Sequence, residues 1–480
     1  MTGGPDQPVK FGYHGPMLRY LLIPVVILAA AFGTVYVVAG RAAAPVIQIH
    51  QPGKLVGQDS TLDVSVEAPR AAFRSLDITL EQKGRSFPLF LLKSTTDATV
   101  KQETPDRIRI TRSIGRRAIP ELRAGPARVV VTASRSVLRG LRTPQATATH
   151  DVDVRLTPPR IGVVSAFHFI NLGGSEMVVY RVTPPDVQSG VMVGREFYPG
   201  FPASGAGVTN ADPSLKVAFF ALLYDQDLNT PISLYARDEA GNQAHSGFDN
   251  RVFDKKFIRS RIEINDAFLQ RVVPDILEHS PEIQPAANND LLADFLKING
   301  DLRRIDTDKI VNIAKQTSPE ILWKGPFIPL GNAAVESKFA DHRTYYHDGK
   351  EIDQQVHLGF DLAVTTNIPV RAGNDGKVLW ADYLGIYGNC IILDHGMGVQ
   401  SLYGHLSSID VGPGDVVKKD QVMGRSGMTG LAAGDHLHFS ILVAGHPVNP
   451  VEWWDPHWIE DRVMRKLREA GAGTSPTPSR

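Results

Sequence analysis

Three short pieces in the last third of the chain contain residue types that could bind a metal ion. They read HLGFD (residues 357–361), LYGHL (402–406) and HLHF (436–439), and the region from residue 342 to 457 holds nine of the 15 histidines. Side chains alternate between the two faces of an extended segment, so His357 and Asp361 share a face, as do His436 and His438. Two imidazoles and one carboxylate commonly hold a catalytic zinc ion, with water in the fourth position.

Such an ion would lower the pKa of its bound water to about 7 and polarise a carbonyl group, which is the chemistry of peptide or ester hydrolysis. The remaining histidines could act as a general base or stabilise a developing oxyanion. Taken alone, the HLHF pair is also compatible with two surface or hydrogen-bonded histidines, because a buried imidazole only needs a polar partner. The metal hypothesis therefore depends on the three pieces together.

A buried strand is predicted to carry the last of these pieces. The eight-residue segment HLHFSILV is almost continuously apolar, and the turn residues AGHP follow it. This pattern indicates a short strand in which Leu437 enters the core while His436 and His438 face the other way.

Taken together, the three pieces resemble the signature of the lysostaphin-type (LytM-domain) zinc metalloendopeptidases. The resemblance covers residues 328 to 455, about a quarter of the chain, and includes SKFADHR, YGNCIILDHGMG and PVNPVEWW. It implies a compact antiparallel β domain with one zinc ion per chain. The ion would be held by His357, Asp361 and His438, with His405 and His436 beside the bound water and the substrate.

Two positions depart from the family's pattern without removing a ligand. Asn367 stands where relatives usually have glycine, and Asp435 precedes His436 where proline is frequent. Asp435 could orient or repel His436 and change its pKa.

The resemblance implies an endopeptidase that hydrolyses the peptide cross-links of bacterial peptidoglycan. Metal-activated water would attack the peptide carbonyl, with His405 or His436 taking the proton and the other stabilising the oxyanion, and no covalent enzyme intermediate would form. Peptidoglycan peptide stems would be the substrate, and cell-wall or membrane proteins could be further partners. The alternative is a non-catalytic LytM-like regulator or scaffold of cell-wall hydrolases, but the chain retains all five site positions.

Composition is that of a folded, multidomain protein. The length of 480 residues suggests about three domains, and the apolar content is 42%. Lys+Arg and Asp+Glu are both 51, so the net charge is zero and no nucleic-acid partner is indicated. Cys390 is the single cysteine, which excludes an intrachain disulfide, and its apolar neighbours predict a small buried side chain.

An uncharged stretch near the N-terminus predicts a membrane span. Residues 20–40 are 21 uncharged residues, and as a helix they would cross the roughly 30 Å hydrocarbon layer of a bilayer. Lys10 and Arg19 precede the stretch and Arg41 follows it, which favours a cytoplasmic N-terminus at residues 1–19. The chain would then be a single-pass protein of the inner membrane, with its catalytic domain in the periplasm or outside the cell. A cleaved signal peptide is the alternative, because RAAAP supplies small residues for cleavage.

A mainly β, multidomain fold is predicted for the rest. Residues 45–158 alternate between polar and apolar residues in segments such as TLDVSVEA and ARVVVTAS, which predicts an antiparallel β-sandwich. TPPR would end this module, and residues 159–253 would form a second, immunoglobulin-like β-rich module. A helical connector (254–325), the peptidase domain (326–458) and a short helix with a disordered tail (459–480) would follow.

Helical periodicity supports the connector. Phe268, Leu269, Val272 and Val273 fall on one helical face, Pro274 is expected to interrupt that helix, and Asn289 could cap the next. WIEDRVMRKLRE, near the C-terminus, predicts an amphipathic helix with solvated charges.

Other residues of the region receive structural interpretations. His395 is expected to stabilise a turn beside the site, and His342 and His347 to lie in a surface loop that could rim the cleft. His446 and His457 are expected to face solvent. The pair Trp453 and Trp454 is expected to close a core.

Overall fold

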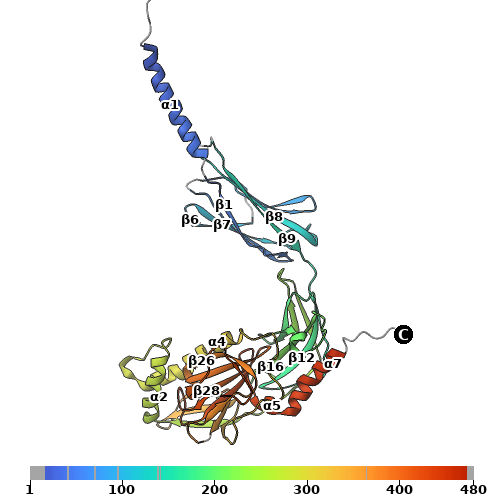
Figure 1. The fold of residues 1–480 in the computed structure, drawn as a ribbon, viewed down its shortest axis with the longest axis vertical. Helices are drawn as coiled ribbons and strands as arrows, with labels where there is room; N and C mark the ends of the chain where they lie inside the picture. The colour runs from blue at the N-terminus through green and yellow to red at the C-terminus, as the bar shows by residue number, and fades with distance from the viewer. Residues whose placement is uncertain are drawn as a thin grey trace, which may run out of the picture. The chain divides into compact units, whose positions relative to one another are not determined.

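The computed structural model describes residues 17–40, 43–69, 72–94, 97–137, 140, 142–363 and 365–472, and strands dominate it (Figure 1). The chain divides into two compact units. The first comprises Met1–Thr157 and Glu239–Asn242, and the second comprises Pro158–Asp238 and Gln243–Arg480. The division between residues 157 and 158 falls within the TPPR segment.

Helix α1 (Met17–Gly40) covers the uncharged stretch. Its described apolar side chains, among them Ile27, Leu28 and Phe32, are exposed. No helix within the described part of the chain is both long enough and apolar enough to cross a membrane. The membrane span therefore stays a prediction, and residues 1–16 of the expected cytoplasmic segment lie outside the described residues.

The rest of the first unit is a sandwich of two sheets, in the strand orders β1-β3-β7-β6 and β2-β9-β8-β4-β5. Leu62 and Ile110 from one sheet and Ile78 and Val129 from the other lie in one core. The alternating sequence pattern predicts this packing correctly, except that β2 pairs with β9 in parallel. The strands are β1 (Val46–Gln51), β2 (Leu55–Val56), β3 (Ser60–Glu67), β4 (Phe73–Gln82), β5 (Arg85–Leu91), β6 (Thr99–Thr104), β7 (Arg107–Ile114), β8 (Gly125–Arg135) and β9 (Gln145–Val154).

The second unit begins with further small sheets, in the orders β10-β12-β16-β15, β14-β13-β17-β18 and β11-β19. The strands are β10 (Arg160–Val163), β11 (His168–Asn171), β12 (Gly174–Thr183), β13 (Gln188–Val193), β14 (Glu196–Pro199), β15 (Phe201–Pro202), β16 (Leu215–Leu222), β17 (Ile232–Arg237), β18 (Gln243–Gly247) and β19 (Asn250–Phe253). Their core is continuous with that of the C-terminal domain, so this β-rich module is not separate from the domain that follows.

Helices α2 (Asp266–His279), α3 (Leu291–Lys297) and α4 (Arg303–Ala314) form the connector. Leu269, Val272 and Val273 are buried on α2, as the periodicity predicts. Pro274 lies on the exposed face of α2 and does not end the helix. The residues around it, Val273 and Ile276, are buried in the core and keep the helix in place.

Two predictions for the connector are wrong. Residues Arg259–Ile264 form strand β20, because RSRIEI alternates in burial and pairs in parallel with residues 83 positions later in the chain. The cap of α3 is Asp290, whose carboxylate accepts a hydrogen bond from the Ala293 N–H, whereas Asn289 lies in the preceding turn.

The C-terminal domain is built on a ten-stranded sheet with the main order β21-β24-β31-β28-β27-β26-β29, and β20, β22 and β23 form a small sheet beside it. The strands are β21 (Ala334–Ser337), β22 (Asp341–His347), β23 (Lys350–His357), β24 (Phe360–Ala363), β25 (Pro369–Arg371), β26 (Gly376–Tyr383), β27 (Asn389–Gly396), β28 (Val399–Ile409), β29 (Val416–Val417), β30 (Val422–Ser426), β31 (Leu437–Val443) and β32 (His446–Val448). Strand β31 is buried along its whole length, as predicted.

The C-terminal helices pack between this domain and the second β-rich module. They are α5 (Pro450–Trp454), α6 (Pro456–Ile459) and α7 (Arg465–Ala472), with a π-helical turn (Glu460–Met464) before α7. Trp453 is fully buried, as predicted, and its indole N–H donates to the Ser175 hydroxyl at 3.0 Å.

One charge of the terminal helix is not solvated as the sequence suggested. The Lys466 Nζ lies 2.7 Å from the Glu176 carboxylate, and both side chains are buried where α7 lies beside β12 (Figure 1). Helix α7 continues to Ala472. Residues 473–480 lie outside the described part of the chain.

Candidate active site

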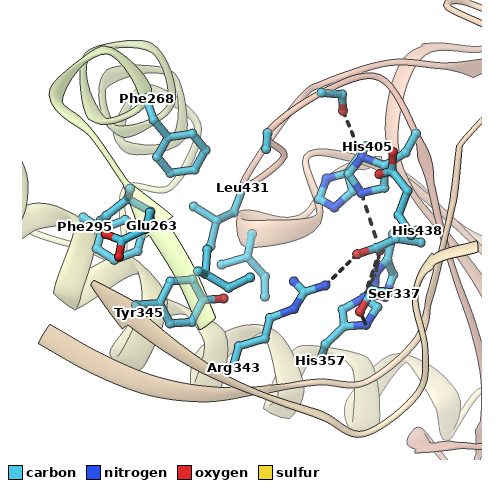
Figure 2. Close-up of a pocket in the computed structure, with 18 of the residues that line it drawn as sticks. Glu263, Phe268, Phe295, Ser337, Arg343, Tyr345, His357, His405, Leu431 and His438 are labelled. Carbon is cyan, nitrogen blue, oxygen red and sulfur yellow. Dashed lines mark hydrogen bonds and ion pairs between the residues drawn. The ribbon is translucent and has the colours of Figure 1, made fainter. Parts of the chain in front are cut away.

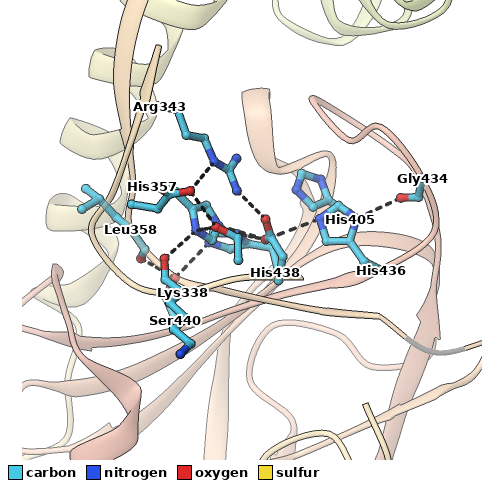
Figure 3. Close-up of polar contacts among 12 residues, drawn as sticks. Lys338, Arg343, His357, Leu358, His405, Gly434, His436, His438 and Ser440 are labelled. Atoms are coloured by element: carbon cyan, nitrogen blue, oxygen red, sulfur yellow. Dashed lines mark hydrogen bonds and ion pairs between the residues drawn. The ribbon is translucent and has the colours of Figure 1, made fainter. Parts of the chain in front are cut away.

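Three of the predicted site residues converge where β23, β24 and β31 meet. Asp361 on β24 is the direct cross-strand partner of His438 on β31, and His357 ends β23 just before the turn into β24. The Asp361 Oδ1 lies 2.9 Å from the His357 Nε2 and 3.1 Å from the His438 Nδ1, and the two nitrogens are 3.0 Å apart (Figure 3). All three side chains are buried.

Hydrogen bonds behind the rings fix which nitrogen carries the proton. The His357 Nδ1 faces the Lys338 carbonyl at 3.2 Å, and a carbonyl can only accept. The Ser440 hydroxyl donates to the Leu358 carbonyl at 2.9 Å, so it accepts from the His438 Nε2 at 3.0 Å. Each ring therefore turns a lone pair towards Asp361, which is how outer partners orient metal-binding histidines.

The three converging atoms fit a small divalent cation. Two nitrogen lone pairs and a carboxylate oxygen are all acceptors, so at these separations they repel one another unless a positive charge lies between them. Zinc bonds of about 2.0–2.2 Å would place tetrahedral neighbours roughly 3.3–3.5 Å apart, only slightly wider than the distances here. Gly359 is needed for this approach, because a β carbon there would lie 2.5 Å from the His438 Nε2.

His405 and His436 lie beside this cluster. His405 sits at an irregularity of β28, where Gly404 and His405 face Cys390, and its φ of 61° turns the ring towards His436. The ring centroids of His405 and His436 are 4.8 Å apart. The His405 Nδ1 donates to the Thr429 carbonyl at 2.8 Å and the His436 Nδ1 to the Gly434 carbonyl at 2.9 Å, which leaves both Nε2 atoms for other partners.

Burial and mutual contact set the charges in the cluster. Burial lowers the pKa of His438 to about 4, and it holds the pKa of His405 well below its ordinary value. Burial opposes ionisation of Asp361, but the neighbouring histidines hold the pKa of this carboxyl well below its usual range. Burial also disfavours the charged form of His436, yet the Asp361 carboxylate raises the pKa of His436.

A cavity of about 680 Å³ opens over the five residues. Figure 2 shows His357, His405 and His438 on one side and Phe268, Phe295 and Tyr345 on the other. The connector helices thus supply part of the wall opposite the metal-binding cluster, through Phe268 and Phe295, and β22 supplies Tyr345.

The sequence motifs do not predict the arginines that line this cavity, which are Arg271, Arg303 and Arg343. Arg343 on β22 donates to the Asp361 Oδ2 at 2.8 Å, and Arg271 on α2 donates to the Ala432 carbonyl at 2.7 Å, four residues before His436. Arg343 lies within SKFADHR, so its position near the early histidine motif was the one available signal.

The two departures from the family's pattern contact each other. The Asn367 backbone N–H donates to the Asp435 Oδ2 at 3.0 Å. Asn367 has a φ of 58°, a left-handed conformation that favours glycine or asparagine. The Asp435 carboxylate therefore holds the Asn367 turn.

The positions of three other histidines differ from the predictions. His342 and His347 lie on strand β22, not in a loop, and neither lines the cavity, because His342 packs on Tyr224 and Phe257 and His347 pairs with Asp266 at 3.0 Å. His446 is half-buried against Glu196 at 3.3 Å, not solvent-facing, because β32 lies on the second β-rich module. His457 is exposed, as predicted.

His395 and Cys390 are fully buried, and Trp454 is half-buried. His395 lies on β27 and not in a turn, and its ring is held between the Asp375 carbonyl and the Ser401 hydroxyl, each at 2.7 Å. Cys390 is fully buried, as predicted, and burial raises the pKa of its thiol well above the ordinary value. Trp454 is half-buried and stacks on Phe439.

Comparison with known proteins gives a consistent assignment for this region. Residues 355–450 match Peptidase family M23. A DD-carboxypeptidase/endopeptidase of Neisseria meningitidis is 40% identical over 97 residues, which is 20% of this chain and 22% of that protein. A glycyl-glycine endopeptidase of Staphylococcus capitis is 38% identical over 127 residues, 26% of this chain and 32% of that protein.

Among solved structures, the catalytic domain of lysostaphin from Staphylococcus simulans aligns with 25% identity and a TM-score of 0.20, covering 30% of this chain and 96% of that domain. The chain spans about a fifth to a third of the length of the two relatives named above. The matched segment contains all five converging residues. The C-terminal part of this protein is therefore a domain of peptidase family M23.

Proposed function

We propose that this protein is a membrane-anchored zinc endopeptidase that hydrolyses peptide cross-links of bacterial peptidoglycan. The observation that carries the proposal is the convergence of the His357 Nε2, the Asp361 Oδ1 and the His438 Nδ1 to within 3.1 Å of one another. With two neutral imidazoles and one carboxylate as ligands, a divalent ion and its ligands would together carry a net charge of +1.

His357, Asp361 and His438 would hold the metal. Zinc bound there would supply a Lewis acid that polarises the scissile carbonyl and acidifies water. His405 and His436 act on the substrate: one ring, neutral, accepts the proton of the attacking water at its Nε2. The other ring, protonated on both nitrogens, donates a hydrogen bond from its Nε2 to the carbonyl oxygen as it becomes negative. Cys390 takes no part as a nucleophile, because it is fully buried.

The substrate is inferred from the names of the relatives. One is a DD-carboxypeptidase/endopeptidase and another a glycyl-glycine endopeptidase. Both names describe hydrolysis of peptide bonds, so we propose a peptide cross-link as the substrate. A DD bond and a glycine bridge give different fragments, which makes product analysis the direct way to separate them.

We expect the full chain to release soluble peptide fragments from isolated peptidoglycan. A chelator should stop the release and added zinc should restore it. The three acceptor atoms of the site repel one another and can hold a cation, which the reaction would require. Mass spectrometry of the fragments measures the activity and identifies the bond. Cleavage that continues in chelator would refute the metal mechanism. A folded protein that binds zinc at no measurable level and cleaves nothing would favour the non-catalytic regulator.

The anchor is proposed from α1. Its apolar side chains, including Val25, Ile27 and Phe32, are exposed in the described part of the helix, and exposed apolar surface of this kind is costly in water. We expect the full chain to sediment with the membrane fraction and to resist extraction by salt, whereas a chain that starts at residue 43 should be soluble. Recovery of the uncleaved full chain in the soluble fraction would contradict the anchor, and N-terminal sequencing would reveal a cleaved leader.

A further inference from the structure

An arginine that precedes residues 355–450, the segment that matches Peptidase family M23, contacts the metal-binding cluster. Arg343 lies on β22, and Figure 2 shows its side chain between Tyr345 and the histidines His357 and His438. Its Nη2 donates to the Asp361 Oδ2 at 2.8 Å, and its side chain is only 21% exposed. A charge-assisted hydrogen bond in such a buried position is stronger than one at the surface.

The two oxygens of Asp361 have separate partners. Oδ1 lies 2.9 Å from the His357 Nε2 and 3.1 Å from the His438 Nδ1, whereas Oδ2 is held by Arg343. The guanidinium therefore holds Oδ2 away from the cluster, so that Asp361 would offer only Oδ1 to a bound ion. This arrangement favours a ligand that binds through one oxygen.

A second chain of contacts links the same arginine to His357. The Arg343 Nε lies 3.5 Å from the Asp341 Oδ2, and the Ser337 hydroxyl donates to that oxygen at 3.3 Å. The Ser337 Oγ in turn lies 3.1 Å from the His357 Nδ1 (Figure 2). Since the Ser337 proton is directed at Asp341, the Ser337 oxygen can share the His357 Nδ1–H with the Lys338 carbonyl, which leaves the lone pair of Nε2 directed at the cluster.

We propose that Arg343 is a positioning residue for the metal site, acting directly on Asp361 and, through Asp341 and Ser337, on His357. The inference rests on the proposed function, because it concerns the affinity for the ion. The planar guanidinium suits the role, since its fork can face both carboxylates at once. A lysine ammonium would contact one of them at a time.

The test compares zinc affinity in the full-length protein, by competition with a chromophoric chelator. We expect Arg343→Gln to weaken zinc binding by about 10–100-fold, the usual effect of removing an outer partner of a ligand. Arg343→Lys should lose less. Arg371→Gln is the matched control, because Arg371 is a half-exposed arginine of the same domain that pairs with Asp420 and contacts no ligand. It should bind zinc as the wild type does.

A spectroscopic measurement separates positioning from a general loss of stability. With cobalt in place of zinc, the visible absorption bands of Arg343→Gln should shift, because Asp361 is free to rotate or to bind through both oxygens. Unchanged bands and wild-type zinc affinity in a folded Arg343→Gln would overturn the inference while leaving the proposed function intact. If Arg343→Gln does not fold, the same result in Arg343→Lys overturns it. Failure of the wild type to bind zinc would overturn both proposals.

Discussion

Replacing His438 with alanine is expected to abolish cleavage and to empty the metal site. The ring is buried and supplies one of the three converging atoms, at 3.1 Å from the Asp361 Oδ1. Without it, the ion keeps one nitrogen and one oxygen from the protein. Because the loss of an outer partner alone costs about 10–100-fold in affinity or activity, we expect loss of a direct ligand to exceed a hundredfold in both.

The measurement pairs zinc content by elemental analysis with release of peptide fragments from peptidoglycan. His457→Ala is the matched control, because His457 is an exposed histidine of the same unit and should retain both properties. Thermal unfolding of metal-free samples shows whether the variant remains folded. One zinc per chain and normal cleavage in His438→Ala would contradict the assignment of this ligand.

The sequence could predict the metal cluster because the relevant contacts follow from local geometry. Period-two alternation places His436 and His438 on one face of a strand and Leu437 on the other, and the structure has Leu437 in the core. His357 and Asp361 are four residues apart and separated by a glycine, so their approach needs no distant partner. Which nitrogen of each ring faces the cluster depends on Ser440 and Lys338 and could not be read from the motif.

Contacts between distant segments explain what could not be predicted. Arg271 reaches the loop before His436 across 161 residues of sequence, and Lys466 pairs with Glu176 across 290. A charged residue in an amphipathic helical pattern is predicted to face solvent, because a partner so distant in the sequence cannot be identified from the pattern. Strand β20 could not be predicted for the same reason, since the residues of β22 that pair with it lie 83 positions later in the chain.

His405 and His436 provide the second prediction with a large effect. Their Nε2 atoms are free of backbone partners, while each Nδ1 is held by a carbonyl at 2.8 or 2.9 Å. Neither is needed to complete the set of three ligands, so both single alanine variants should retain zinc. Cleavage should nevertheless fall by about 10²–10⁴-fold in each, the usual contribution of general acid–base catalysis.

Glutamine variants distinguish the two roles. A glutamine amide can donate a hydrogen bond to a developing oxyanion but cannot accept and pass on a proton at neutral pH. His405→Gln and His436→Gln should therefore differ, and the variant that keeps more activity than its alanine counterpart identifies the residue that stabilises the oxyanion. The measurement is the rate of fragment release per bound zinc, which removes any effect of metal loss. Wild-type rates in both alanine variants would exclude these histidines from the reaction, whereas a double variant no slower than the more impaired single variant would show that the two act in one step.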